Sequence, residues 1–478
     1  MFLTVIETIH HSGFQHENHW YPKLINTQIN PLVSHFFKMD IKRIVTRYCH
    51  LHPSVKPSYL EELFTYKPQY FFWSGGDLIN VTSSTGKRQM VLIETNSCPS
   101  GQKSTPLLDD FDEYGGYSKL IAGGVQNFLK GKRMSSGVLA VFYDKNPMES
   151  SGYAHALSNH YDEQVYLVKF FNGESNDHVK IEDNKFHILV EGEWLPVRFV
   201  FRYLTQKPWN RLPVDCKTLI FNPIVTCLAG GRNKLLASKA YDFFNAELGN
   251  HHLQINTPET HMNIRQEEIP YWYEKFGGNL VVKSPYSNAG QGVFLISNRS
   301  ELEVFMNSSF DYETFIVQSL IGNHLWSSVS EKGKLYHVGT LPDKNNLTYV
   351  SDLRMMIHYT STGFKPLCMY ARRAEEPLPD TLQGHNTWSV LGTNISVKKG
   401  ENKWDYDVKR LITLDRRDFN KLGLGMDDLI EAFMQTIFAT IAIDKMASTL
   451  VSKKERKLKR RLFYSLNPDQ SLLDEIMK

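Results

Sequence analysis

The sequence predicts an α/β protein built from several packed lobes. Short runs of apolar and β-branched residues recur between polar stretches, which is the pattern of buried strands. Between several of these runs lie stretches whose apolar residues follow the period of a helix. A chain of 478 residues is also too long for one hydrophobic core. We therefore expect strands and helices to alternate in two or three units.

The middle of the chain predicts a wound α/β unit at roughly residues 116–256. Four runs have the composition of strands, and two stretches between them have helical periodicity. The predicted strands are residues 138–143, 165–171, 197–203 and 218–221, and the predicted helices are residues 150–160 and 233–245.

The remaining chain divides into three further segments. Residues 280–283 and 293–296 predict two strands around a Gly/Ser/Asn loop, so a smaller hairpin-based lobe is expected over residues 257–335. Residues 336–478 form the next segment, with expected strands at 353–358 and 367–372 and a buried helix at 426–446. Residues 1–115 form an N-terminal segment that contains another hairpin.

Composition limits the classes of partner. The 54 basic and 51 acidic residues leave a formal net charge of +3, which provides no strong field for nucleic acid or an acidic membrane. The basic run at residues 453–461 is more typical of a solvated helix face than of a nucleic-acid site. Five scattered cysteines without a CxxC pair, and no long apolar run, predict a cytoplasmic protein with no disulfide framework. The sequence does not indicate an oligomeric state.

A small-residue loop in residues 279–296 (NLVVKSPYSNAGQGVFLI) is a candidate phosphate site. Lys283 ends one strand, and Gly290 and Gly292 precede the next. Glycines allow backbone N–H groups to approach anionic oxygens, and the lysine supplies a point charge. GxxxxGK[ST] and helix-opening GxGxxG patterns are absent, so those nucleotide folds are disfavoured. Taken alone, the loop is more typical of a Gly/Asn-rich hairpin turn than of a phosphate site.

The order of elements around this loop resembles the ATP-grasp superfamily. Thr257-Pro258-Glu259-Thr260 precedes the loop, and the β run at residues 315–321 follows it. The resemblance implies that ATP binds with its phosphates at Lys283, under a lid formed by the following loop, and with adenine at a hinge. It also implies an earlier nucleotide-contacting lysine, for which Lys239 is preferred over Lys234, although an exposed helix lysine is an equal alternative. The implied nucleotide residues are Lys239, Lys283, Ser284, Ser287, Gly290, Gln291, Gly292, Gln318, Leu320 and Ile321.

A hairpin early in the chain carries candidate metal ligands. Residues 75–101 contain Asp77 at the start of one expected strand, and Glu94 and Asn96 at the end of its partner. Alternation puts Glu94 and Asn96 on one side, where oxygen donors suit Mg²⁺. The Glu-x-Asn segment resembles the metal site of ATP-grasp enzymes, where it comes late in the chain. Its early position implies a circularly permuted large lobe. The alternative is a surface hairpin with unrelated polar residues.

Arginines of two expected strands complete the candidate site. Residues 351–357 resemble the Asp-x-Arg strand of peptide-forming ATP-grasp enzymes, and residues 369–374 resemble its partner strand. Guanidinium groups can bind a transferred phosphoryl group bidentately. Arg354 is one candidate, and since Arg372 and Arg373 point to opposite faces, only one should reach the site; the family pattern favours Arg373. The predicted catalytic set is therefore Arg354, Arg373 and Lys283.

These observations predict an ATP-dependent ligase that needs Mg²⁺. It would activate a small-molecule or peptide carboxylate as an acyl phosphate and join it to an amine or thiol, with release of ADP and phosphate. Three alternatives remain at this point. The same fold can transfer phosphate to a hydroxyl, Cys98 could be the nucleophile of a hydrolase, or the chain could be a binding protein on a decayed ATP-grasp frame.

Overall fold

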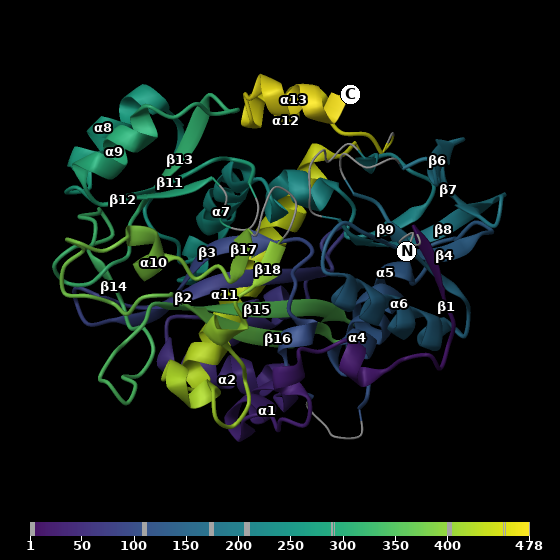
Figure 1. The fold of residues 1–478 in the computed structure, drawn as a ribbon, viewed down its shortest axis with the longest axis horizontal. Coiled ribbons are helices and arrows are strands. Elements are labelled where there is room, and N and C mark those ends of the chain that lie inside the picture. The colour runs from purple at the N-terminus through teal and green to yellow at the C-terminus, as the bar shows by residue number, and fades with distance from the viewer. Residues whose placement is uncertain are drawn as a thin grey trace.

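The computed structural model describes residues 5–107, 112–171, 176–204, 211–287, 290, 292–398, 404–452, 454 and 456–477. The predicted α/β class is confirmed, with three main sheets and helices packed around them (Figure 1). One sheet belongs to the middle of the chain, one to the lobe after it, and one combines early and late segments. Gln291, a predicted lid residue, lies outside the described residues.

The wound sheet has the strand order β1-β5-β4-β8-β7-β6, with β9 added beside β8. Its pairs β4–β5, β4–β8 and β8–β9 are parallel. Near-continuous apolar runs are expected for such strands, because both faces of a parallel sheet are usually covered. The strands are β1 (Ile6–Ile9), β4 (Val138–Tyr143), β5 (Val165–Lys169), β6 (Val179–Glu182), β7 (Lys185–Val190), β8 (Glu193–Tyr203) and β9 (Leu219–Phe221). Helices α4 (Gly116–Lys119), α5 (Gln126–Leu129) and α6 (Pro147–Tyr161) belong to the same unit.

Strand β1 was not predicted, and it crosses the predicted domain boundaries. It pairs antiparallel with β5, so residues 6–9 complete the wound sheet although they lie in the predicted N-terminal segment 1–115. A four-residue strand with alternating polar positions gives little signal by itself, since its edge position depends on the partner strand.

The lid sheet has the order β10-β13-β11-β12 and lies opposite the wound sheet in Figure 1. Its strands are all antiparallel, and one of its faces packs on two helices through a separate apolar cluster. The elements are β10 (Thr260–Arg265), α8 (Ile269–Lys275), β11 (Leu280–Lys283), β12 (Val293–Ile296), α9 (Arg299–Met306) and β13 (Thr314–Ser319).

The central sheet joins segments that are far apart in the sequence. β2 (Trp73–Ser83) pairs with β3 (Arg88–Asn96) on one edge and with β15 (Ser351–Thr360) on the other, and β15 pairs with β16 (Gly363–Arg373). β14 (Leu335–His337) and β19 (Leu411–Ile412) extend this sheet. Asp77 therefore lies in the middle of a strand that begins at Trp73, four residues before the start predicted for it.

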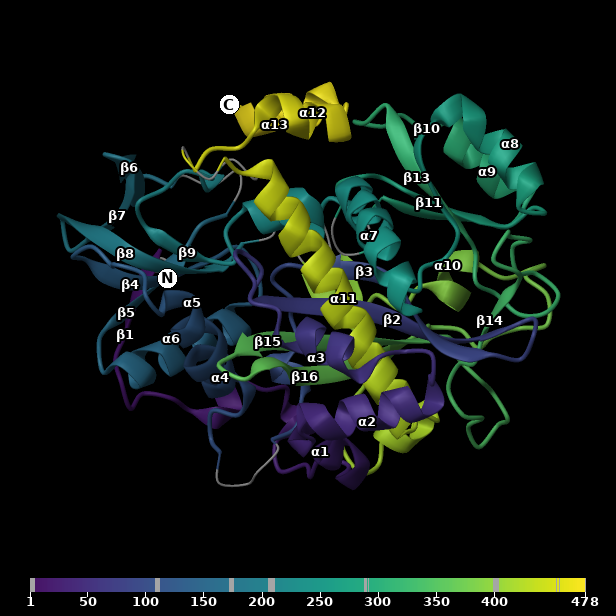
Figure 2. The same cartoon turned by 180° about the vertical axis from the view of Figure 1, so that it is seen from behind.

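A long helix, α11 (Met426–Leu450), crosses one face of the central sheet, as Figure 2 shows. It contacts β2, β3 and β15, and on another side α7 (Lys234–Leu248). Because it is enclosed on several sides, it is apolar around most of its surface. Its buried Asp444 accepts hydrogen bonds from the backbone N–H groups of Gln69, Tyr70 and Phe71, which fixes the chain where it enters β2.

The other elements surround these layers. Helices α1 (Pro31–Lys38), α2 (Ile41–Leu51) and α3 (Pro57–Thr65) lie near one end of α11, and α12 (Arg460–Leu466) and α13 (Gln470–Met477) follow it. α10 (Thr387–Leu391) and the hairpin β17 (Ser396–Lys398) with β18 (Trp404–Tyr406) come between β16 and β19.

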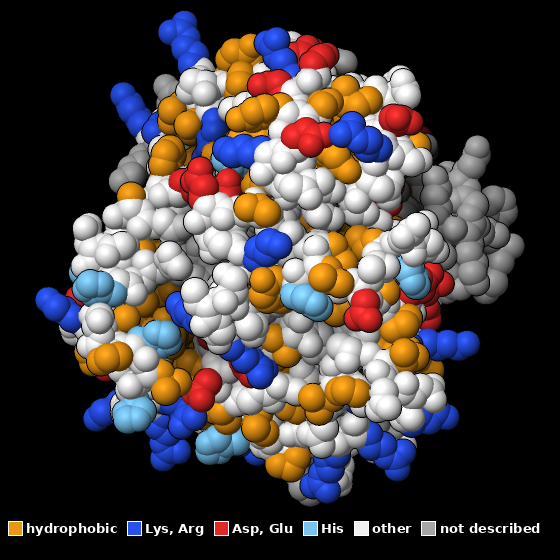
Figure 3. Space-filling model, turned by 90° about the vertical axis from the view of Figure 1, so that its left-hand side faces the viewer, with side chains coloured by type: hydrophobic (Ala, Val, Ile, Leu, Met, Phe, Trp, Pro, Cys, Tyr) orange, Lys and Arg blue, Asp and Glu red, His pale blue; other side chains and the backbone are white. Residues whose placement is uncertain are grey.

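The surface carries mixed charge. On the face shown in Figure 3, basic and acidic side chains are interspersed with hydrophobic ones. Within the described part of the chain, no helix combines the length and the apolar character needed to cross a bilayer.

Candidate functional site

The three sheets surround a cavity of about 300 Å³. Its walls come from β2 and β3, from β11 to β13, from β15 and β16, and from loops of the wound unit. The charged side chains that line it are Lys145, Arg232, Lys234, Lys283, Arg354, Arg372, Asp77, Glu94 and Asp352. Six are basic and three are acidic, so the cavity is suited to anionic ligands.

Lys283 projects into this cavity from the end of β11, as predicted for a phosphate-binding lysine. Its Nζ donates to the Ile93 carbonyl oxygen at 3.1 Å. The Lys283 pKa is lowered to about 8, mainly by burial; Glu94 raises it and the nearby Lys234 lowers it. A phosphate would restore the environment that favours the charged amine.

The loop after Lys283 closes on itself. The Ser284 backbone N–H donates to the Gly292 carbonyl at 2.7 Å, and Gly290 and Gly292 both have positive φ, at 77° and 67°. Those conformations favour glycine. Gly290 lines the cavity, whereas Ser284, Ser287 and Gly292 are not among the lining residues. Of the described residues of the predicted lid, only Gly290 lines the cavity.

The second of the predicted lysines that lines the cavity is Lys234 rather than Lys239. The Lys234 Nζ lies 3.4 Å from a Glu94 carboxylate oxygen and donates to the Ser287 carbonyl at 3.0 Å. Lys239 donates instead to the Leu466 carbonyl at 2.5 Å and does not line the cavity. Five residues along α7 correspond to a rotation of about 140°, so the two lysines cannot point to the same place. The preference for Lys239 was therefore wrong.

The predicted hinge lies at one end of the cavity. Gln318, Leu320 and Ile321 all line it. Apolar side chains from four strands line the cavity together with the hinge: Ile79, Ile93, Val281, Val293 and Leu295. Such an apolar slot suits a flat heteroaromatic base. His337, which was not predicted, also lines the cavity, and burial lowers its pKa to about 4.

Glu94 and Asn96 lie side by side on β3 and face the cavity, as alternation predicts. Burial opposes ionisation of Glu94, but Lys234 lowers its pKa below the usual value. A carboxylate and an amide oxygen fit Mg²⁺ that also binds nucleotide phosphates, because Mg²⁺ usually takes only one or two protein carboxylates. Among the described residues, no cluster of three His, Cys, Asp or Glu side chains has the geometry of a metal site.

Asp77, the third predicted metal ligand, is occupied by arginines. Its two oxygens accept from Arg354 at 2.5 and 2.6 Å, and one also accepts from Arg372 at 3.1 Å. Burial opposes ionisation of Asp77, but both guanidinium groups hold its pKa well below the usual range. The Asn96 amide donates a fourth, longer hydrogen bond at 3.5 Å, so Asp77 fits the role of arginine anchor and does not fit that of metal ligand.

Changing Asp77 to asparagine tests this assignment. The amide cannot compensate the two buried guanidinium groups, so the variant should lose about 3–5 kcal/mol of unfolding free energy. Denaturant titration measures this loss. The Mg²⁺ concentration that half-saturates nucleotide binding should stay within about twofold of wild type, because the candidate ligands Glu94 and Asn96 are unchanged. A tenfold rise in that concentration would instead indicate that Asp77 is a metal ligand.

The second arginine of the site is Arg372, not Arg373. Arg372 bonds Asp77 and Asp352 inside the cavity. The Arg373 guanidinium lies over the Tyr349 ring, 4.2 Å from its centre, and lines a different surface groove. Neighbouring residues of a strand point to opposite faces, and the register that pairs Arg354 with Tyr370 gives Arg354 and Arg372 the same face. The choice of Arg373 was therefore wrong.

The chain is similar in structure to ATP-grasp proteins. A glutathione synthetase-like effector from Globodera pallida, in apo form, is 11% identical, with 78% of this chain and 88% of that chain covered and a TM-score of 0.37. A RimK domain ATP-grasp protein from Sphaerobacter thermophilus is 13% identical, with coverage of 48% and 90% and a TM-score of 0.30. D-alanyl-alanine synthetase A from Vibrio cholerae is 11% identical, with coverage of 49% and 88% and a TM-score of 0.27.

No protein-family model matches the sequence, and no curated protein does. The functional proposal below therefore depends on the geometry of the cavity.

Cys98 does not have the environment of a nucleophile. It is fully buried, is absent from the cavity wall, and its Sγ donates to the Arg202 carbonyl at 3.1 Å. Burial raises the pKa of its thiol to about 11, although Arg202 acts in the opposite direction. A cysteine nucleophile requires a thiolate that a substrate can reach. The structure therefore disfavours the hydrolase alternative.

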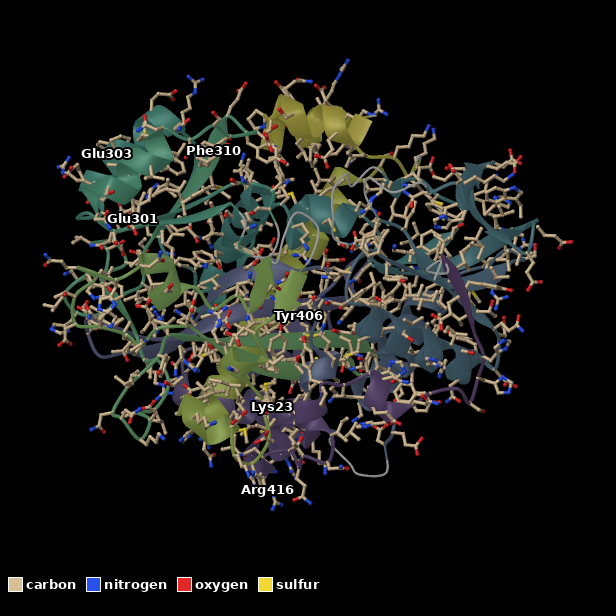
Figure 4. All side chains as sticks on the ribbon, viewed as in Figure 1. Lys23, Glu301, Glu303, Phe310, Tyr406 and Arg416 are labelled. Carbon is tan, nitrogen blue, oxygen red and sulfur yellow. The ribbon has the colours of Figure 1, made fainter. Side chains whose placement is uncertain are left out.

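Several cavity residues were missed by sequence reasoning. Lys145 follows the carboxyl end of β4, Arg232 precedes α7, and Tyr406 ends β18 near the centre of the molecule (Figure 4). Ligands of open α/β sheets bind at the carboxyl ends of parallel strands, so the position of Lys145 carried a usable signal. Arg232 and Tyr406 had none, because only tertiary packing brings them to the wall.

A buried arginine links the hairpin with the wound unit. Arg202 is fully buried and donates to the carbonyls of Ser97 at 2.9 Å and Leu204 at 2.8 Å, as well as to the carbonyl of Asn222. Ser97 follows Asn96, so this arginine holds the end of β3 in place. Its role is to position the hairpin rather than to bind ligand.

Replacing Arg202 by methionine should destabilise the protein strongly. The variant leaves buried carbonyls at Leu204 and Asn222 without this donor, and we expect a loss of about 3–5 kcal/mol. Denaturant unfolding measures it. Arg299→Met is the control, since that side chain is 75% exposed and should change stability by less than about 0.5 kcal/mol. An Arg202 variant as stable as this control would show that the hydrogen bonds of Arg202 do not contribute to the unfolding free energy.

Proposed function

We propose that the protein is an ATP-grasp ligase with a circularly permuted large lobe, which activates a carboxylate as an acyl phosphate and transfers the acyl group to an amine or thiol. One observation carries the proposal. A single cavity is lined by a lysine and a glycine suited to phosphate, by an apolar slot beside the hinge, and by a Glu-x-Asn pair. Two arginines that are held by aspartates also line it. The early hairpin and the late strands meet there, since Asp77 and Arg354 are register partners in one sheet.

Each group has a part in binding ATP. The slot beside residues 318–321 takes the base, and Lys283 and Lys234 take phosphate oxygens. Lys234 is the first residue of α7, so the N–H groups and dipole of this 15-residue helix act in the same direction. Glu94 and Asn96 would hold magnesium, which would neutralise phosphate charge when bound.

The arginines are suited to the acid substrate. Arg354 and Arg372 are held by Asp77 and Asp352, so their guanidinium groups cost little reorganisation when an anion arrives. A carboxylate oxygen would attack the γ-phosphorus, the bond to the bridging oxygen would break, and ADP would leave with that electron pair. An amine or thiol would then form a bond to the acyl carbon and release phosphate, with its proton passing to solvent or to a base.

The test is a screen of paired substrates for ADP release. The protein, MgATP, an amino-acid or dipeptide carboxylate, and an amine or thiol acceptor are combined, and ADP, free phosphate and joined product are measured. A ligase forms ADP, phosphate and joined product in equal amounts, and only when both the carboxylate and the amine or thiol are present. A stable phosphoester without free phosphate would identify a phosphotransferase instead, and failure to bind MgATP would refute the proposal.

A further inference from the structure

The cations of the cavity are not equally compensated. Arg354, Arg372 and Lys234 form ion pairs with the three acidic lining residues. Among the described residues, Lys145, Arg232 and Lys283 form no ion pair. Lys283 is accounted for by the nucleotide phosphates. Lys145 and Arg232 remain as two buried cations without an ion pair in the described part of the chain; Asp144 acts on Lys145 and Arg232 acts on Glu94 only at longer range.

Lys145 lies where the wound unit meets the cavity. Its Nζ donates to the Cys98 carbonyl at 3.2 Å and lies 5.1 Å from the centre of the Tyr203 ring. Its pKa is lowered to about 7, mainly by burial and then by the positive charge of Arg232; Cys98 and Asp144 act in the opposite direction, and Arg354 adds a smaller lowering effect. Among the described residues, the amine therefore faces two guanidinium groups and has no ion pair of its own.

The Arg232 side chain has fewer polar partners than that of Lys145. Its residue is 7% exposed, and the side chain forms no hydrogen bond or ion pair within the described part of the chain. In particular, its Nε is buried and has no acceptor. Buried guanidinium groups are normally paired, because an uncompensated charge costs several kcal/mol. An anionic ligand at this place would remove that cost.

The negative charge of the proposed substrates matches the number of cavity cations that have no ion pair. MgATP carries two negative charges and a reacting carboxylate carries one, against three cations without ion pairs. The walls near Lys145 also offer hydroxyl and amide groups, from Ser100, Asn146 and Tyr406. Asn146 and Ser100 bond each other at 3.1 Å, and the Tyr406 hydroxyl donates to Asn146. This end of the cavity is polar, unlike the apolar slot at the hinge.

We propose that Lys145 and Arg232, together with Arg354, bind the reacting carboxylate and the acyl phosphate made from it. This inference rests on the proposed function and adds two catalytic residues to it. When the carboxylate oxygen bonds to the γ-phosphorus and ADP departs, the transferred phosphoryl group comes to lie among these three cations. The same cations then hold the phosphate that the amine or thiol displaces.

The test uses the whole protein, MgADP and inorganic phosphate, which together mimic the product complex. Phosphate should raise the melting temperature of the MgADP-bound wild type. In Lys145→Met and Arg232→Met its affinity should fall about 10- to 100-fold, as expected for a charge-assisted hydrogen bond, while MgADP affinity changes less than about threefold. A ligand-free melting temperature equal to or above wild type is also expected, because each substitution removes an uncompensated buried charge.

A structural role would give the opposite pattern. Lower ligand-free melting temperatures with unchanged phosphate affinity would overturn the inference, as would phosphate binding that does not need MgADP. Lys130→Met, an exposed lysine of the same unit, is the matched control and should resemble wild type. If wild type fails to bind MgADP, the proposed function itself fails. If it binds MgADP but phosphate affinity is the same in all variants, only the assignment of Lys145 and Arg232 fails.

Discussion

Glu94→Ala is expected to reduce ATP-dependent ADP formation by about 10³-fold or more and to leave the protein folded. Among the described lining residues, Glu94 is the carboxylate that no arginine pairs with, and in the proposed site it holds magnesium, whose charge stabilisation is worth several kcal/mol. The change also leaves Lys234 without its partner at 3.4 Å. ADP release at saturating MgATP measures the loss, and circular dichroism checks the fold.

Glu303→Ala is the control for this variant. Glu303 lies on α9, where Figure 4 labels it; its side chain is exposed, and it is not one of the residues that line the cavity. It should turn over like wild type. If Glu94→Ala keeps more than about a tenth of wild-type ADP formation, the contribution of Glu94 is below about 1.4 kcal/mol, and the metal site has to be placed elsewhere.

Lys283→Met is expected to lower kcat/KM for ATP by at least about 100-fold, since one preorganised donor to developing charge is worth roughly 2.7–4 kcal/mol. Methionine preserves most of the volume of the side chain and removes its charge. Because Lys283 contacts phosphate in the proposed complex, affinity for ATP should fall, whereas affinity for adenosine should stay within about threefold. Steady-state kinetics and calorimetric titration measure the two effects.

Lys275→Met provides the comparison for Lys283. Lys275 is an exposed residue at the end of α8 in the same lobe, and its loss should change neither measurement. Equal weakening of ATP and adenosine binding in Lys283→Met would indicate damage to the lobe rather than loss of a phosphate contact. That result would remove Lys283 from the phosphate site.

The residues predicted correctly to share a cavity are those whose local pattern constrains direction. Glu94 and Asn96 follow the two-residue period of a strand, and Lys283 ends a strand before glycines that need positive φ. In each case the direction of the side chain depends on neighbours within a few positions. The same local information placed β4, β11 and β12 at their observed bounds.

The predictions that were wrong concern residues for which the local pattern fits two nearby positions equally well. Lys234 and Lys239 are both helix lysines, and Arg372 and Arg373 are adjacent on one strand, so each choice depends on which face the rest of the chain covers. The role of Asp77 was missed for a related reason. Its partners Arg354 and Arg372 lie almost three hundred residues away and are brought to it only by strand pairing.

The amino-acid sequence by itself determined the α/β class, most strands, the loop after Lys283 and the Glu-x-Asn pair, because hydrophobic period and turn chemistry act over short distances. Tertiary structure decided that the early hairpin joins the late strands in one sheet, that Asp77 anchors two arginines, and that Lys145 and Arg232 line the cavity without an ion pair among the described residues. These outcomes depend on which distant surfaces bury one another, and a charge acquires its role only from the groups that burial places beside it.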